Sequence, residues 1–418
     1  MALSPFYDAL EARPAGEREA ALMAALPKHL AHAKQNAPGW ARILKDVDAA
    51  AVTTRAALAQ LPVTRKSELA DLQKAMPPLG GLNATPPEKL AKLFVSPGPV
   101  YDPEGQGKDW WRTARSLYAA GFRPGDKVLN AFSYHFTPAA SMVEHGALAV
   151  GCTVVPGGTG QTEMQAAAIR DLRLTAFAGT PSFLKLIMEK ADELKTDVTS
   201  LDKAIVGAEY LPPALRQAMR ARGIRVQQLY ATADLGLLAY ESALPDGTLT
   251  EGMILEESLI LEIVRPGTGD PVPAGEVGEV VVTSLNADYP LIRFATGDLS
   301  AVLAGTSPCG RTNTRIKGWM GRADQTTKVR GMFVHPHQIA DVVKRFPLIQ
   351  RARVVVDTAD DGDRMRVLCA VSNTVDGLKL QIETAVREIT RLRGDVEFVE
   401  AQVLPNDGKV IEDLRKVS

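Results

Sequence analysis

Between residues 126 and 230 the hydrophobic positions follow two alternating patterns. Short apolar runs of strand length cover 126–132, 152–158, 174–180, 201–209 and 224–230. Between them, apolar residues recur every three or four positions, as on one face of a helix, over 137–151, 162–173, 181–194 and 212–223. A single short run could be part of a buried helix, but the regular repetition favours strands. Strands that alternate with helices of this length are typical of parallel βαβ units.

The two ends of the chain differ from this central region. Residues 1–90 are rich in Ala and Leu with breaks at prolines, which predicts mainly helices. Strand-like segments at 258–266, 275–285 and 298–305 predict a compact antiparallel β region. Beyond 325, four strand-like segments (326–336, 351–360, 364–372 and 396–405) and two amphipathic helices (337–346 and 378–392) predict a small α+β unit.

We therefore predict an α/β protein with two domains. A large N-terminal domain, residues 1–322, combines parallel βαβ units with a β subdomain. A small C-terminal α+β domain covers residues 323–418. The boundary is placed near residues 321–324, where the pattern changes.

Composition excludes several classes of protein but points to no chemistry. The 48 Lys and Arg residues nearly balance 49 Asp and Glu residues, so no basic surface for nucleic acid is expected. No apolar run is long enough to span a bilayer, and the N-terminus becomes charged too early for a signal peptide. Three scattered cysteines suit a reducing compartment. These features predict a cytoplasmic protein without nucleic-acid or membrane partners.

Three segments follow predicted parallel strands, at 133–138 (SYHFTP), 207–213 (GAEYLPP) and 230–236 (YATADLG). Ligands in open α/β sheets bind at the carboxyl ends of the strands. Taken singly, each segment is better explained as a plain strand-to-helix turn, since a fold alone does not give a function. Considered with three later segments, they form an ordered set: 292–300 (IRFATGDLS), 321–331 (GRADQTTKVRG) and 404–410 (LPNDGKV).

This ordered set resembles the adenylate-forming enzyme superfamily, and most of the chain is similar to the phenylacetate–CoA ligases. The resemblance implies the adenylate-forming ligase fold and an ATP-dependent acyl or aryl acid–CoA ligase. Such enzymes form an acyl adenylate from a carboxylic acid and ATP, then pass the acyl group to a thiol. The implied cofactors are ATP or AMP, Mg²⁺ and coenzyme A. The implied partner is a small carboxylic acid, expected to be aromatic, and a homodimer is possible.

The resemblance also assigns roles to single residues around the adenine. The backbone of Gly207, Ala208 and Glu209 is expected to lie along the adenine edge, and Tyr230 is expected to offer its ring to the adenine face.

Five further residues receive roles at the ribose, at the reacting atoms and at the junction of the domains. Asp298 is expected to accept hydrogen bonds from the ribose hydroxyls, which suits an ionised carboxylate, and Arg322 to contact the ribose side. Lys409 is the expected catalytic residue, since an ammonium can stabilise charge that develops on the acyl and phosphate oxygens. Asp324 is expected at the hinge, and Gly331 near the thiol entrance. By themselves, Asp298, Asp324 and Lys409 could equally be ordinary turn residues.

The acid is expected near the segment 133–138 and the end of the strand at 230. Tyr134, His135, Phe136 and Ala231 are the candidate substrate residues, in an aromatic or apolar pocket. No proton abstraction is required of His135, because carboxylates are already ionised at neutral pH. Some relatives carry a cysteine cluster near position 309, but one thiol cannot form a four-ligand site, so no structural zinc is expected.

The phosphate-facing part departs from the family pattern. Relatives have a loop rich in Gly, Ser and Thr whose N–H groups bind phosphates, but here 96–105 reads SPGPVYDPEG. Ser96 and Gly98 are retained, and Lys108 is a displaced candidate for the loop lysine. Three prolines, at 97, 99 and 103, cannot donate an N–H. Asp102 and Glu104 are expected to repel a triphosphate if they face it.

A second departure concerns the metal. Relatives have Tyr-Gly-x-Thr/Ser-Glu, in which the Glu holds Mg²⁺, whereas here the segment is Tyr-Ala-Thr-Ala-Asp, ending at Asp234. Asp234 is the candidate metal ligand, with a shorter reach than Glu. Three hypotheses remain open: an ATP-dependent ligase with an atypical loop, an enzyme acting on pre-formed adenylates or thioesters, and a non-catalytic binding protein. The first is favoured because Lys409 has no purpose in a mere binder.

Overall fold

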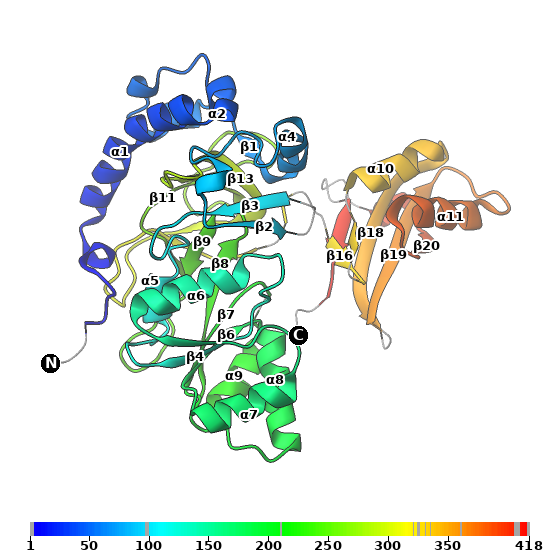
Figure 1. Cartoon of the computed structure of the whole chain (residues 1–418). Coiled ribbons are helices and arrows are strands. Elements are labelled where there is room, and N and C mark those ends of the chain that lie inside the picture. The colour runs from blue at the N-terminus through cyan, green and yellow to red at the C-terminus, as the bar shows by residue number, and fades with distance from the viewer. Residues whose placement is uncertain are drawn as a thin grey trace. The chain divides into compact units, whose positions relative to one another are not determined.

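The protein is described by a computed structural model over residues 4–96, 100–209, 211–320, 322–323, 327–330, 332–334, 336–359, 362–404 and 410–415. The chain divides into two compact units, residues 1–320 and 321–418 (Figure 1). Rotation of the second unit during a reaction stays a prediction.

The first unit is built around a nine-stranded sheet in the order β14-β15-β10-β9-β8-β7-β6-β4-β5. Its parallel half confirms the predicted βαβ units. The parallel strands are β4 (Lys127–Asn130), β5 (Thr153–Pro156), β6 (Ala176–Gly179), β7 (Lys203–Val206) and β8 (Arg225–Thr232). The antiparallel strands are β9 (Gly236–Tyr240), β10 (Met253–Leu255), β14 (Val302–Leu303) and β15 (Arg315–Ile316).

Helices cover both faces of the parallel strands because neighbouring residues of each strand point to opposite faces. Val128 packs with α5 (Ala114–Ala119) and α6 (Ala139–Val150). The next residue, Leu129, packs on the other face, with the helices α7 (Thr162–Leu172), α8 (Pro181–Glu193) and α9 (Pro213–Ala221). Figure 1 shows these two groups on opposite sides of the strands.

A second sheet of the first unit has the order β1-β13-β12-β11. Its strands are β1 (Thr64–Arg65), β11 (Leu259–Val264), β12 (Gly278–Ser284) and β13 (Leu291–Ser300). The strand predicted at 298–305 is instead the end of β13 followed by β14, and the two belong to different sheets.

The N-terminal region is helical, as predicted, and packs against the second sheet. Its longer helices are α1 (Ala15–Asn36), α2 (Pro38–Ile43), α3 (Arg55–Ala59) and α4 (Leu69–Ala75). Leu26, Leu30 and Trp40 share a core with Ile260 and Phe294 of the sheet. The buried indole N–H of Trp40 donates to the Pro290 carbonyl at 2.6 Å. Leu61 and Leu69 belong to the same core, and Lys66, which lies between them in sequence, binds Asp234.

The segment SPGPVYDPEG belongs to a β-hairpin formed by β2 (Lys92–Ser96) and β3 (Val100–Glu104). Ser96 pairs with Val100 beside the turn, and Lys92 pairs with Glu104 at the other end. Pro103 lies inside β3. Its missing N–H is therefore a donor lost from the strand, and not from the segment that joins the two strands.

Both acidic residues of the hairpin are fully buried. Neither carboxylate therefore lies on the exposed surface of the hairpin, and the repulsion of a triphosphate that is expected if they face it stays a prediction. Ser96 Oγ donates to Asp102 Oδ2 at 2.7 Å. Burial, and next the charge of Asp234, raises the pKa of Asp102 to about 7, against the opposing hydrogen bond from Ser96.

Glu104 is held by four donors around its carboxylate. They are Trp111 Nε1 at 2.6 Å, Lys92 Nζ at 2.8 Å, His145 Nε2 at 3.3 Å and the hydroxyl of Ser141. Burial alone raises the pKa of Glu104, but these hydrogen bonds outweigh burial and lower it to about 2. Glu104 therefore anchors the base of the hairpin to α6 and to Trp111.

The second unit is a small α+β fold around a sheet of order β20-β19-β18-β21, next to a hairpin of β16 and β17. Its elements are β16 (Thr327–Val329), β17 (Met332–Val334), α10 (Pro336–Arg345), β18 (Ile349–Ala359), β19 (Gly362–Val371), α11 (Leu378–Thr390), β20 (Asp395–Phe398) and β21 (Ile411–Asp413). The strand predicted at 396–405 ends early, since residues 401–403 form a 3₁₀ turn. In neither unit is any described helix both long and apolar enough to cross a membrane.

Asp102→Asn tests the buried carboxyl of the hairpin. A carboxyl whose pKa is raised on folding makes the native state lose stability as pH rises from the unfolded pKa, near 4, to the folded pKa, near 7. We expect the variant to melt at the same temperature as the wild type at pH 4. At pH 8 it should melt higher by a few °C, at roughly 2–4 °C per kcal/mol.

Melting curves at pH 4, 6 and 8 measure this difference, and Glu88→Gln, at an exposed position, serves as the control. A difference between Asp102→Asn and wild type that does not grow with pH would show that Asp102 is ionised throughout.

Candidate active site

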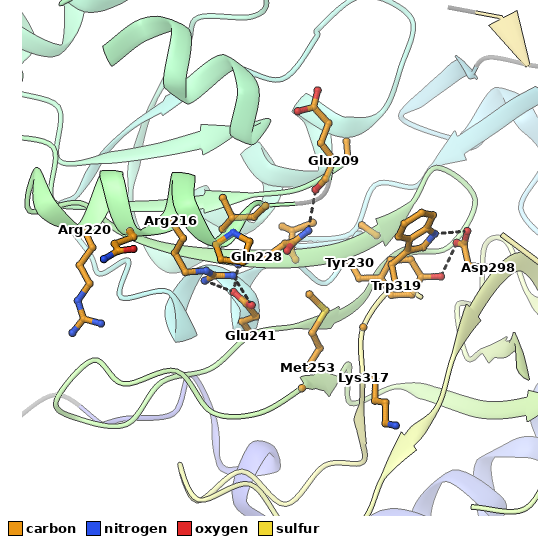
Figure 2. A pocket seen from close by; sticks show the side chains of 18 residues that line it. Glu209, Arg216, Arg220, Gln228, Tyr230, Glu241, Met253, Asp298, Lys317 and Trp319 are labelled. Carbon is orange, nitrogen blue, oxygen red and sulfur yellow. Dashed lines mark hydrogen bonds and ion pairs between the residues drawn. The ribbon is translucent and has the colours of Figure 1, made fainter. Parts of the chain in front are cut away.

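A cavity of about 840 Å³ opens in the first unit where β7 and β8 end (Figure 2). Its walls come from the segment after β7, from α9, from β8, β10 and β13, from Glu241 and Gly252, and from residues 317–319. Small-molecule sites usually have volumes of about 300–1,000 Å³. The cavity lies at the carboxyl ends of parallel strands, where the sequence predicts a ligand.

Asp298 is the buried charge at one end of this cavity, and it is only 6 % exposed. The Tyr230 hydroxyl donates to Asp298 Oδ2 at 2.7 Å, and the Trp319 indole N–H donates to Oδ1 at 3.1 Å (Figure 2). A buried carboxylate is costly without donors, and here each oxygen has one. The structure thus brings together the two predicted residues Tyr230 and Asp298, and adds Trp319.

The segment Gly207–Glu209 turns sharply after β7. Ala208 has a left-handed φ of 65°, and the Glu209 carbonyl accepts a hydrogen bond from Gln228 Nε2 at 2.9 Å. A side chain at Gly207 would place its Cβ 2.8 Å from Leu229, which is itself buried. Ala208 and Glu209 line the cavity and Gly207 does not. Their expected contact with the adenine edge stays a prediction.

The other end of the cavity is polar and was not predicted. Arg216 on α9 makes two hydrogen bonds to Glu241, at 2.7 and 2.8 Å. The Gln228 backbone N–H also donates to Glu241, at 2.7 Å. Gln228 could have been found, because it lies two residues before Tyr230 on β8 and alternate residues share a face. For Arg216 and Glu241 the sequence offers no comparable signal.

Ser96 and Lys108 lie at opposite ends of the hairpin. The Ser96 hydroxyl, beside the turn, is engaged by Asp102. Lys108 is exposed and follows the far end of β3, about 13 Å along the strand from that turn at about 3.3 Å per residue. Gly105 packs against Trp110 and Asp288, which leaves no room for a Cβ. Residues 105–108 therefore do not rebuild a phosphate loop at the turn.

The carboxylate of Asp234 forms an ion pair with Lys66. The Asp234 side chain is fully buried, and Lys66 Nζ donates to Oδ2 at 2.6 Å. Burial lowers the pKa of Lys66, but the charges of Asp234, Asp102 and Asp298 more than compensate and raise it. The Lys66 side chain as a whole is 32 % exposed.

Lys66 binds Oδ2 of Asp234, the expected metal ligand, while Oδ1 is buried and has no hydrogen-bond partner among the described residues. A single carboxylate suits Mg²⁺ only together with phosphate and water oxygens, so the metal stays a prediction. Within the described residues, no group of three or more His, Cys, Asp and Glu side chains could hold a metal ion. Cys309 instead lies within hydrogen-bonding distance of the hydroxyls of Ser307 and Ser242. We assign no chemical step to a metal.

Of the four candidate substrate residues, only Ala231 lines the cavity; Tyr134, His135 and Phe136 of the segment 133–138 do not. Tyr134 donates its hydroxyl to Glu144 at 2.7 Å. His135 is exposed, and Phe136 exposes 75 % of its side chain on a backbone with φ of 60°. The segment forms no packed aromatic pocket. Its one link to the hairpin is a hydrogen bond from Val95 N to the Phe136 carbonyl at 2.8 Å, among the described contacts.

Four predicted site residues lie outside the described residues: Gly98, Asp324, Gly331 and Lys409. Arg322 is described, belongs to the second unit and is partly buried. The roles of these five residues stay predictions.

Comparison with known proteins agrees with the resemblance seen in the sequence. Residues 108–287 match the AMP-binding enzyme family. The chain is 30 % identical to a phenylacetate–coenzyme A ligase of Thermus thermophilus, over 84 % of this chain and 82 % of the relative. It is 32 % identical to the enzymes of the same name from Aromatoleum evansii, over 76 % and 73 % of the two chains, and from Escherichia coli, over 81 % and 79 %.

Solved structures support the fold. A 2-hydroxyisobutyryl-CoA ligase in complex with its acyl-AMP and CoA superimposes with a TM-score of 0.75 at 23 % identity, over 99 % of this chain and 93 % of that one. At this identity the likeness shows the fold, which is the predicted adenylate-forming fold. The sequence relatives show more, and the chain belongs to the phenylacetate–coenzyme A ligase family of AMP-forming acid–thiol ligases.

Proposed function

We propose that this protein activates an aromatic carboxylic acid with ATP and transfers the acyl group to coenzyme A. The observation that carries the proposal is the carboxylate of Asp298, buried in the cavity and held by Tyr230 and Trp319. An ionised carboxylate accepts hydrogen bonds only, and a ribose diol offers two donors. The turn at 207–209 and the ring of Tyr230 then give the adenine two surfaces.

In the first step, a carboxylate oxygen of the acid attacks the α-phosphorus of ATP, and pyrophosphate leaves with the bonding electrons. The product is an acyl adenylate. Charge accumulates on the phosphate oxygens in the transition state, so fixed cations accelerate the step. Lys409 is assigned to the acyl and α-phosphate oxygens. Lys66 is assigned to the phosphate oxygens, in place of the lysine that relatives carry in the phosphate loop. It interacts with the carboxylates of Asp234, Asp102 and Asp298, which raise its pKa.

In the second step, the sulfur of the thiol attacks the acyl carbonyl carbon, the thiol proton is released, and AMP leaves. Coenzyme A is the assigned acceptor, because the sequence relatives are named for it. Arg322, Asp324 and Gly331 are assigned to this stage from the resemblance. The same names support an arylacetic acid as substrate.

A second candidate function is supported by the phosphate-facing residues. Ser96 is bonded to Asp102, and Asp234 is bonded to Lys66, so two groups expected to serve the triphosphate already have partners. A homologue with this arrangement could bind adenylates or act on a pre-formed acyl adenylate while using ATP poorly.

The exchange of labelled pyrophosphate into ATP tests the proposal. We expect exchange that depends on an added aryl acid, with phenylacetate in the panel. The absence of exchange with every acid, together with thioester formation from a supplied acyl adenylate, would favour the second candidate.

Asp298→Ala should weaken AMP and ATP by the same factor, because the ribose is common to both. Hydrogen bonds to a charged group contribute about 1.5–3 kcal/mol, so the loss should be roughly 10- to 100-fold. Calorimetry measures both affinities, with Asp246→Ala at an exposed position as the control. If the AMP affinity is unchanged, Asp298 does not bind the ribose and the assignment is wrong.

Lys409→Ala should reduce adenylate formation by at least about 100-fold, as expected when one stabilising group is removed from the transition state. Thioester formation from a supplied acyl adenylate should be largely retained, because the lysine is needed in the first step only. Lys344→Ala, in an exposed part of the second unit, is the matched control. Equal loss in both half-reactions would contradict the assignment.

AMP should bind more tightly than ATP. Pro97 and Pro99 remove two backbone donors from the turn, which corresponds to roughly a hundredfold in affinity. The double variant Pro97→Thr, Pro99→Thr restores these donors and should strengthen ATP while leaving AMP unchanged. Calorimetry on one preparation decides, and tighter binding of ATP than of AMP by the wild type would refute the expectation.

A further inference from the structure

Trp319 combines two properties that no expected role explains. The residue is 49 % exposed, yet its indole N–H is directed to Asp298, which is only 6 % exposed. Exposed indoles can satisfy their N–H with water, so this contact is not required by the burial of Trp319 itself. The contact instead serves the carboxylate.

The backbone around Trp319 is fixed to the strand that carries Asp298. Lys317 N donates to the Ala301 carbonyl at 2.9 Å, and Met320 N donates to the Leu299 carbonyl at 2.9 Å. Between them, the Ser300 hydroxyl donates to the Gly318 carbonyl at 2.7 Å. These three hydrogen bonds hold residues 317–320 alongside the end of β13, so the indole has a defined starting point next to the carboxylate.

Gly318 allows the turn that directs the indole inward. Its φ is 89°, in the left-handed region that residues with a Cβ avoid. Trp319 lies beside Asp298 in the lining of the cavity, which also includes Lys317 and Met253 (Figure 2).

Two donors on different oxygens control the rotation of the Asp298 carboxylate. The terminal torsion of an Asp side chain is otherwise broad. Tyr230 holds Oδ2 and Trp319 holds Oδ1, at 2.7 and 3.1 Å. A ribose diol presents two hydroxyl groups in a fixed relation, and a receptor that is already oriented binds more tightly than one that must be ordered on binding.

We propose that Trp319 is a positioning residue for the nucleotide, which orients Asp298 toward the ribose hydroxyls through its indole N–H. This inference rests on the proposed function, because it requires that the ribose contacts Asp298. The residue also lines the cavity. The experiment must therefore distinguish the contribution of the indole ring to AMP binding from that of its N–H.

Trp319→Phe keeps an aromatic ring and removes the N–H. We expect AMP to bind about 5- to 20-fold more weakly to this variant, within the range for a lost hydrogen bond to a charged group. For 2′,3′-dideoxyadenosine 5′-monophosphate, which has no ribose hydroxyls, the affinity should change less than about 2-fold. In an Asp298→Ala background, Trp319→Phe should have no additional effect on AMP.

Intrinsic fluorescence gives a second readout. Trp40 and Trp111 are fully buried and Trp110 is partly buried, so Trp319 is the tryptophan most accessible to a ligand. AMP should change the emission of the wild type, and Trp319→Phe should remove that change at saturating AMP. Equal melting temperatures of variant and wild type confirm that the fold is kept.

The outcomes separate this inference from the proposed function. If Trp319→Phe binds AMP and the dideoxy nucleotide more weakly by the same factor, Trp319 only lines the cavity, and the positioning role is overturned. Unchanged or tighter AMP binding by Trp319→Phe, with Asp298→Ala still impaired, would also overturn it while the proposed function stands. If Asp298→Ala binds AMP like the wild type, both fail.

Discussion

The burial of one carboxylate organises the ligand-binding end of the first unit. Asp298 is nearly inaccessible, and a buried charge must be surrounded by donors. Its donors come from β8 of the nine-stranded sheet and from the segment 317–320, while Asp298 itself lies on β13 of the other sheet. The requirement to satisfy this single charge therefore joins the two sheets at the cavity and fixes the surface that we assign to the ribose.

The hairpin of β2 and β3 satisfies its buried charges in another way. Asp102 and Glu104 belong to the hairpin that carries the altered loop, and both are enclosed by the protein. Glu104 is satisfied by four donors, whereas Asp102 has the Ser96 hydroxyl and lies near Lys66 and Asp234. The acidic residues of this hairpin thus stabilise its attachment and do not form a negatively charged surface. Of the two, only Asp102 acts on Lys66, whose pKa is raised by the carboxylates of Asp234, Asp102 and Asp298 against the effect of burial.

Much of the fold follows from local pattern. The alternation of apolar runs and amphipathic segments predicts the parallel strands and the helices on both faces, because each pattern has its own period. Tyr230, Ala208, Glu209 and Asp298 were predicted to share a site, and all four line the cavity.

The parts that could not be predicted depend on contacts between distant segments. Trp319 and Lys66 carry no motif, and their importance appears only when they are seen beside Asp298 and Asp234. The alternation of a strand places Asp102 and Glu104 on one face, but which face is buried depends on Trp111 and Ser141, which the pattern does not locate.

The account is tested most directly by a crystal structure of the protein with AMP. It predicts the ribose hydroxyls within about 3 Å of the Asp298 carboxylate, at hydrogen-bonding distance, and the adenine between the Tyr230 ring and the backbone of residues 207–209. AMP bound elsewhere, or in this cavity with its ribose directed away from Asp298, would contradict it.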